Sequence, residues 1–208
     1  MIRHLLRLAL CIGLAVAPAS ACHAYSDKIA DMPAGVYVID KAHASITAKV
    51  MHEDFSNYTF RFLRFDGSFN FDPAKPTASK LRVTIDPASI DTATGGDNFG
   101  KMFDAMLAGD GWLETAKFPT ATFVSTAIDI GDGHRGKVVG DLTLHGVTKP
   151  VVLEVTFNGS GPALPPGTLK SGFSATTVIK RSDFGVTKFI PGVGDNVTLN
   201  IEIEFNKQ

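Results

Sequence analysis

Cysteine is nearly absent from this chain of 208 residues, which contains only Cys11 and Cys22. Two cysteines are too few for a disulfide scaffold or a four-cysteine zinc site. An excess of one charge is also missing, because 20 Lys and Arg face 21 Asp and Glu. The resulting net charge of −1 argues against a broad basic surface for nucleic acid. Hydrophobic residues make up 44% of the chain, which is enough to bury a core.

Signatures of catalysis and of metal binding are missing as well. The chain has no GxSxG elbow and no P-loop, and Gly192-Val193-Gly194 lacks the third glycine of a dinucleotide fingerprint. His43, His52 and His145 do not have the spacing of a zinc motif such as HExxH. We therefore expect no catalytic residue, no metal and no cofactor.

The first 24 residues have the pattern of a secretory signal. Arg3 and Arg7 precede an apolar run of about ten residues, 8–17, and small residues follow that run. The run is too short to span a bilayer as a helix. We expect residues 1–24 to be a leader that directs export, and residues 25–208 to form one domain.

Two cleavage positions fit this leader. Cleavage after Ala24 removes both cysteines, whereas cleavage after Ala21 leaves Cys22 at the new N-terminus, where lipid modification is conceivable. No other apolar stretch approaches the ~20 residues of a membrane span, so we expect no transmembrane segment in the mature chain.

Alternation of apolar and polar residues with period two predicts many short strands. Two such runs lie near the start of the mature chain, at 36–40 and 45–52. Residues 137–146 and 150–158 flank a short connection and predict a hairpin. The glycines and prolines of 159–167 predict a surface loop after it.

One helix is expected, between Asp97 and Ala108. Phe99, Met102, Phe103 and Met106 recur there at intervals of three and four residues, which places them on one helical face. Many strands with one short helix indicate an all-β fold, either an antiparallel barrel or a sandwich. A sandwich would use every apolar face for a solid core, whereas a closed barrel of about eight strands has room for one small ligand. The strand pattern alone does not choose between them.

Several motifs, in order along the chain, resemble those of the YceI-like family. They are Tyr37-Val38-Ile39-Asp40-x-x-His43, Phe65-Asp66-Gly67, Ile85-Asp86-Pro87-Ala88-Ser89-Ile90-Asp91-Thr92, Lys117-Phe118-Pro119-Thr120-Ala121-Thr122-Phe123, Gly140-Asp141-Leu142-Thr143-Leu144-His145-Gly146-Val147-Thr148-Lys149-Pro150-Val151 and Arg181-Ser182-Asp183-Phe184-Gly185. The resemblance extends from about Ala34 to Phe205. It implies an extended, lipocalin-like antiparallel barrel in the periplasm, which binds a long polyisoprenoid, an isoprenoid quinone or a similar lipid in an internal channel.

Apolar and aromatic side chains are the candidates for such a channel, because a polyprenyl chain forms no hydrogen bonds and is bound only by removing its surface from water. The candidates are Ile46, Val50, His52, Tyr58, Phe60, Phe62, Phe69, Val83 and Phe123 in the barrel, with Phe99, Phe103, Met106 and Trp112 near its mouth. The helix that carries three of the mouth residues is expected to act as a lid. Each of these apolar residues is equally well explained as part of a solid core.

A ligand's head group would need polar partners, and three residues are candidates for them. His52 shares a strand face with Ile46 and Val50, while Arg61 and Arg181 offer guanidinium groups that suit a phosphate. The alternative for Arg181 is a structural bond to Asp183 or to a loop carbonyl. For His43 and His145, which are not head-group candidates, the alternative to a metal site is a bond to nearby backbone or to the Asp40 and Asp141 carboxylates.

These observations favour a periplasmic carrier that binds and releases a hydrophobic small molecule without bond chemistry. Two other interpretations remain: an exported enzyme that acts on a lipid or a quinone, and a structural or stress-protective β domain with a filled core. A homodimer is also left open, because the two-faced strand at 197–205 would be available for pairing if it lay at a sheet edge.

Overall fold

The computed structural model describes residues 25–93 and 97–208, so the predicted leader at 1–24 lies outside the described residues. The strands are β1 (Gly35–His52), β2 (Ser56–Phe62), β3 (Phe65–Phe71), β4 (Lys80–Ile85), β5 (Ile90–Asp91), β6 (Ala121–Asp129), β7 (Arg135–Leu144), β8 (Val147–Ala163), β9 (Thr168–Lys180) and β10 (Val193–Lys207). The helices are α1 (Asp97–Ala108) and the short 3-10 helices η1 (Ile29–Asp31), η2 (Pro76–Ala78), η3 (Pro87–Ser89) and η4 (Arg181–Phe184). The single α-helix among the described residues has the bounds that the apolar spacing predicts.

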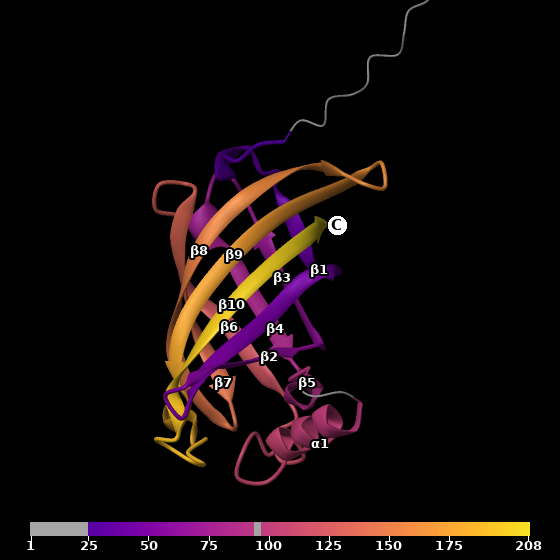
Figure 1. Ribbon diagram of the computed structural model, residues 1–208. Helices are drawn as coiled ribbons and strands as arrows, with labels where there is room; N and C mark the ends of the chain where they lie inside the picture. The colour runs from indigo at the N-terminus through magenta and orange to yellow at the C-terminus, as the bar shows by residue number, and fades with distance from the viewer. Residues whose placement is uncertain (1–24, 94–96) are drawn as a thin grey trace, which may run out of the picture.

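Eight of the strands close into an antiparallel barrel (Figure 1). Their order around the wall is β1, β3, β4, β6, β7, β8, β9 and β10, and β10 pairs with β1 to complete the circuit. The barrel is therefore confirmed and the sandwich is not formed. β2 pairs with the C-terminal part of β1 and carries the two-residue β5, outside the closed circuit. Because β10 is paired with both β1 and β9, residues 197–205 are not the free edge considered for a homodimer.

β1 is the longest strand, and it replaces the two separate runs expected at 36–40 and 45–52. Its ladder with β10 shifts between Ile39 and Ala44, where five steps along β1 match two steps along β10. The extra residues form a bulge, which lets one strand keep its inward face apolar on both sides of the irregularity.

The hairpin predicted from 137–158 is confirmed as β7 and β8. Its turn consists of His145 and Gly146, both with positive φ, 50° and 75°. Two consecutive residues of this kind make the tight connection that fits the twist of a β-hairpin. The loop expected at 159–167 is wrong in its first half, because 159–163 continue β8 and pair with β9 beyond a register shift at Phe157.

Buried apolar side chains form two clusters at two levels of the barrel. The upper core cluster consists of Met32, Tyr37, Ile39, Phe71, Phe157 and Phe205. The lower core cluster consists of Ala48, Val50, Phe123, Leu142, Val151, Leu153, Ile179, Phe184 and Val197. Figure 1 shows α1 at the lower end of the barrel, and residues 25–34 at the opposite end.

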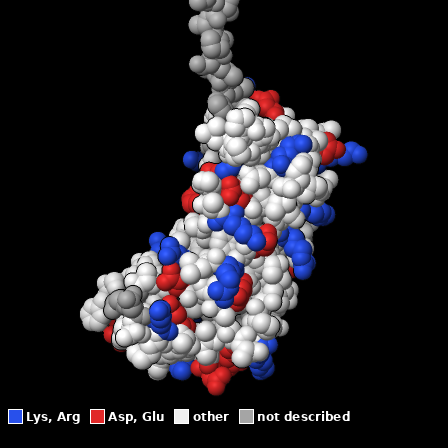
Figure 2. All heavy atoms as spheres, turned by 90° about the vertical axis from the view of Figure 1, so that its right-hand side faces the viewer, with Lys and Arg blue, Asp and Glu red and all other residues white. Residues whose placement is uncertain are grey.

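The surface shows no large area of one charge on the face seen in Figure 2, where Lys and Arg are interspersed with Asp and Glu. Several of these charges form ion pairs between neighbouring strands, such as Lys41 with Asp66 at 2.7 Å and Lys137 with Glu154 at 2.9 Å. None of the described helices has the length and apolar character needed to cross a membrane.

Candidate functional site

The barrel encloses a cavity of about 200 Å³ between the two core clusters. Its wall is built by strand alternation, since every second residue of a barrel strand faces the lumen. On β8, for example, Val151, Leu153 and Val155 line the cavity, whereas the intervening Val152 and Glu154 are exposed. Side chains from the other strands complete a wall that is almost entirely hydrocarbon, including Phe69, Phe71, Leu81, Phe173, Ala175 and Ile203.

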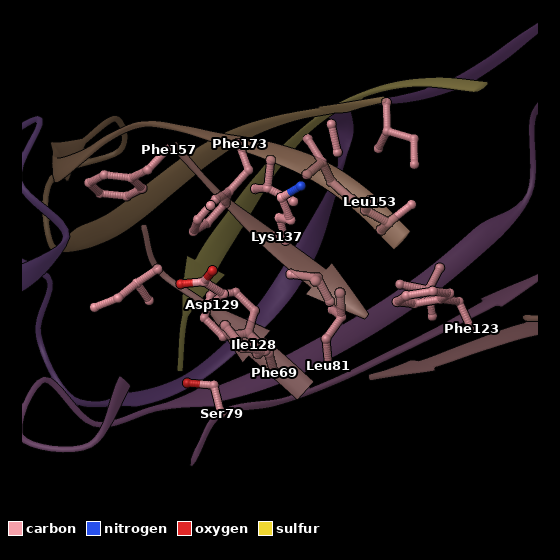
Figure 3. A pocket seen from close by; sticks show the side chains of 18 of the residues that line it. Phe69, Ser79, Leu81, Phe123, Ile128, Asp129, Lys137, Leu153, Phe157 and Phe173 are labelled. Carbon is pink, nitrogen blue, oxygen red and sulfur yellow. The ribbon is translucent and has the colours of Figure 1, made fainter. Parts of the chain in front are cut away.

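The cavity is elongated, with Phe157 near one end and Phe123 at the other (Figure 3). The Phe157 end reaches η1 through Ile29, the segment of η2 through Pro76, and the turn between β6 and β7 through Gly133 and His134. His134 is exposed, so the cavity approaches the surface at this end. We call this end the mouth.

The element that covers the mouth is η1. Ile29 is half-buried there and lies beside Gly133 of the β6–β7 turn. Two backbone hydrogen bonds of 2.9 and 2.8 Å between Ser26 and Ser160 tie this N-terminal segment to β8. Ser79 lines the same end, and its buried hydroxyl has no hydrogen-bond partner among the described residues. The mouth therefore combines an apolar cover with the unpartnered Ser79 hydroxyl, and the charged residues Asp129, Arg135 and Lys137 beside the β6–β7 turn also line the cavity.

The opposite end of the cavity is a floor of packed side chains. Ile46, Thr177 and Leu199 still line the cavity on β1, β9 and β10. The next inward residues toward α1 on these strands are Ala48, Ile179 and Val197, and all of them belong to the lower core cluster. The lower half of the barrel is thus a solid core, and the hollow occupies only the upper half.

Four of the predicted cavity residues line the cavity: Ile46, Phe69, Val83 and Phe123. They come from β1, β3, β4 and β6, which are consecutive strands of the wall; β3 pairs with the first residues of β1. The structure thus brings together residues as distant in the sequence as Ile46 and Phe123, which are 77 positions apart. Their contact with a ligand stays a prediction.

The remaining predicted barrel residues lie outside the cavity. Val50 is buried in the lower core cluster, and Tyr58 and Phe60 of β2 pack against that cluster. Phe62 and Arg61 line a separate cleft of about 400 Å³ at the corner between β2 and β3. The Arg61 guanidinium is paired there with Asp91 at 2.7 Å. The sequence pattern assigned these side chains to the correct strand faces, but it could not show that β2 leaves the closed barrel.

The expectation that α1 and Trp112 flank the mouth is wrong. No residue from α1 is among the described residues that line the cavity, and α1 lies at the floor end of the barrel (Figure 1). Phe103 contacts Tyr58 with ring centroids 5.5 Å apart, while Phe99 and Met106 are largely exposed. Trp112 is buried against Phe189 of the loop before β10, at a centroid distance of 5.9 Å.

Neither His52 nor Arg181 reaches the cavity. His52 is exposed. It is the last residue of β1, and it follows the register shift that separates Val50 from His52 in the ladder with β10. The Arg181 side chain is buried and donates hydrogen bonds of 2.7–2.9 Å to the carbonyls of Val186, Lys188, Val193 and Gly194. Burial lowers the pKa of this guanidinium. The structural alternative for Arg181, a bond to loop carbonyls, is therefore the observed one.

Most of the residues that line the mouth half of the cavity were not among those predicted from the sequence. Phe71, Phe157, Phe173 and Phe205 all lie on its wall. Phe157 and Phe205 ended runs whose alternation was visible in the sequence, so their inward direction could have been inferred. The alternation does not show at which level along the barrel axis each residue lies.

The bulge of β1 carries a polar cluster outside the cavity. Lys170 Nζ lies 2.6 Å from Asp40 Oδ2 and 2.8 Å from Glu204 Oε2, and His43 Nδ1 lies 3.0 Å from the same Asp40 oxygen. Asp40, His43 and Glu204 have the atom types of metal ligands, but the Lys170 ammonium occupies the position that bridges both carboxylates. The His145 ring contacts the Phe184 carbonyl at 2.9 Å, as one of its alternatives predicts.

The hydrogen bond from Lys170 holds the pKa of Asp40 well below its ordinary value. A carboxyl whose pKa is lower in the folded state stabilises that state at neutral pH, and loses this effect as pH falls below about 4. We expect Asp40→Asn to lower the free energy of unfolding by about 1–2 kcal/mol at pH 7, and by clearly less at pH 3. Urea denaturation at both pH values measures this difference. Asp66→Asn, which removes an exposed partner of Lys41, is the control and should change stability by less than about 0.5 kcal/mol; an equal loss in both variants would contradict the role of Asp40.

An eight-stranded antiparallel barrel closed around an apolar hollow defines the lipocalin-like class of folds. Within that class, the chain belongs to the YceI-like family, whose domain matches residues 37–205. The chain is 41% identical over 171 residues to a UPF0312 protein of Pseudomonas savastanoi pv. phaseolicola, which covers 81% of this chain and 84% of that protein.

Solved structures show the same architecture. Burkholderia cenocepacia BcnA has a TM-score of 0.66 at 32% identity, and the match covers 80% of this chain and 98% of that one. The Campylobacter jejuni YCEI protein has a TM-score of 0.64 at 34% identity, covering 77% of this chain and 91% of that one. A polyisoprenoid binding domain from Saccharophagus degradans shares the fold at 17% identity, with a TM-score of 0.56 and coverage of 85% and 100%.

Proposed function

We propose that this protein is an exported carrier that holds the hydrocarbon chain of an isoprenoid-type lipid in its barrel cavity. The observation that carries the proposal is the hydrocarbon-lined hollow between the two core clusters, because an empty apolar cavity in an otherwise packed barrel costs stability unless a ligand fills it. The polyisoprenoid binding domain of Saccharophagus degradans supports it at the level of the fold. Carriage needs only binding and release, and the cavity wall offers mainly hydrocarbon groups for that purpose.

The size of the cavity limits how much of the chain it holds. A protein cavity of about 150 Å³ accommodates benzene, so a cavity of about 200 Å³ has room for roughly eight carbons. Burial of that many carbons contributes at most about 6 kcal/mol before ordering costs. We therefore propose that the end of an isoprenoid chain, one or two isoprene units, occupies the cavity. The head group and the rest of the chain would extend through the mouth beside η1.

The test is to purify the full-length gene product from the periplasm of a bacterial host and to extract it with organic solvent. Mass spectrometry of the extract should find an isoprenoid lipid in a near-stoichiometric amount, and intact mass should show loss of residues 1–24. An extract without lipid from well-folded protein would favour the structural β domain. Chemical conversion of an added lipid or quinone would favour the enzyme instead.

A further inference from the structure

The floor of the cavity contains one aromatic ring, that of Phe123. Phe123 lies on β6 between Val83 of β4 and Leu142 of β7, and all three side chains line the cavity. Phe123 also belongs to the lower core cluster, so it contacts both the hollow and the solid half of the barrel. Leu142, Val151 and Leu153 share this double membership, but Phe123 is the aromatic residue among them.

The position of this ring depends on a glycine in the neighbouring strand. Gly140 of β7 faces the lumen, and a methyl group added there would collide with the far edge of the Phe123 ring, at Cζ. The ring therefore reaches from its own strand across the inner face of β7. A side chain at 140 would exclude it from that place.

Directly below the ring, the lumen is filled. Ala48 and Val50 of β1, together with Ile179 and Val197, occupy the barrel interior on the side of α1. Phe123 is only 6% exposed, so its ring seals the cavity against this core rather than lying loosely in the hollow. Figure 3 shows the ring at the end of the row of lining side chains.

We propose that Phe123 is the residue that sets how much of a prenyl chain the protein buries. This inference rests on the proposed function, and it adds a chain-length limit to it. A chain that enters at the mouth gains affinity with each carbon it buries, by about fourfold in Kd per CH₂ at most. The gain stops when the end of the chain meets the ring, and further isoprene units remain outside the cavity.

The experiment measures Kd for a series of linear prenyl alcohols of increasing length, by native mass spectrometry of delipidated protein. For the unmodified protein, Kd should fall with each added isoprene unit and then level off. Phe123→Ala removes about six carbons of ring, close to the about five carbons of one isoprene unit. The plateau should therefore move by one unit toward longer alcohols, with a gain of at least about tenfold in affinity for the first alcohol beyond the original limit.

Two further variants keep the result interpretable. Phe123→Leu disturbs the core less, and should still move the plateau in the same direction if the alanine variant does not fold. Phe55→Leu makes the same change in the turn between β1 and β2, at a position that is 86% exposed and outside the cavity, and should leave the plateau where it is. An unchanged plateau in a folded Phe123 variant overturns the chain-length role while leaving the carrier function intact. Failure of the unmodified protein to bind any alcohol of the series overturns the carrier function itself, and the inference with it.

Discussion

Replacing Ala175 with Phe should empty the barrel of its ligand. Ala175 lies on β9 between Val155 of β8 and Ile201 of β10, midway between the mouth and the floor, and it lines the cavity. A six-membered ring alone fills a cavity of about 150 Å³, so a benzyl group at this position would occupy most of the about 200 Å³ available. We expect retention of a copurified or added isoprenoid to fall at least about tenfold, as measured by solvent extraction and mass spectrometry.

The fold should survive this change, because the new ring fills a hollow instead of a packed site. The cost of overpacking, about 1–3 kcal/mol, would be offset in part by the apolar surface that the ring buries. Val178→Phe is the matched control, since Val178 lies three residues further on the same strand with 58% of its surface exposed. It should retain lipid as the unmodified protein does. Full retention by a folded Ala175→Phe variant would mean that lipid binds elsewhere on the molecule.

Most of the strands could be predicted from the alternation of apolar and polar residues along the sequence. The period-two runs at 137–158 and 197–205 gave the hairpin and the last barrel strand, since every second residue of a strand must face the core. The choice of a barrel came from the resemblance to the YceI-like family, because alternation is the same in a sandwich and in a barrel. The bulge at 40–43 was hidden, because three extra residues between two apolar runs look like a loop until both runs are seen paired with β10.

The cavity was harder to predict than the strands that enclose it. Alternation places Ile46 and Val50 on the same inward face, yet Ile46 lines the hollow and Val50 lies in the solid core. The difference is their height along the barrel axis, which depends on the stagger of strands that are distant in sequence. The position of α1 could not be predicted for a similar reason. The sequence of an amphipathic helix shows which of its faces is apolar, but not at which end of a barrel the helix lies.

Removing the guanidinium of Arg181 should cause the largest loss of stability among single changes in this protein. Arg181 is 6% exposed, and its side chain donates to four carbonyls of 186–194, the segment that leads into β10. Arg181→Ala would leave those acceptors without their donor at the lower end of the barrel. Since a buried unsatisfied polar group costs about 1–3 kcal/mol, we expect the free energy of unfolding to fall by about 3–5 kcal/mol. Urea denaturation at pH 7 measures this loss.

The conservative variant separates a structural role from contact with a ligand. Lysine at 181 keeps the positive charge but cannot donate in four directions from a planar group, so Arg181→Lys should recover only part of the lost stability. Arg82→Ala, at an exposed position on β4, should change stability by less than about 0.5 kcal/mol. If Arg181 is purely structural, the folded fraction of Arg181→Lys will hold as much lipid per molecule as the unmodified protein. A selective loss of lipid from stable Arg181→Lys protein would instead assign the guanidinium to the ligand's head group.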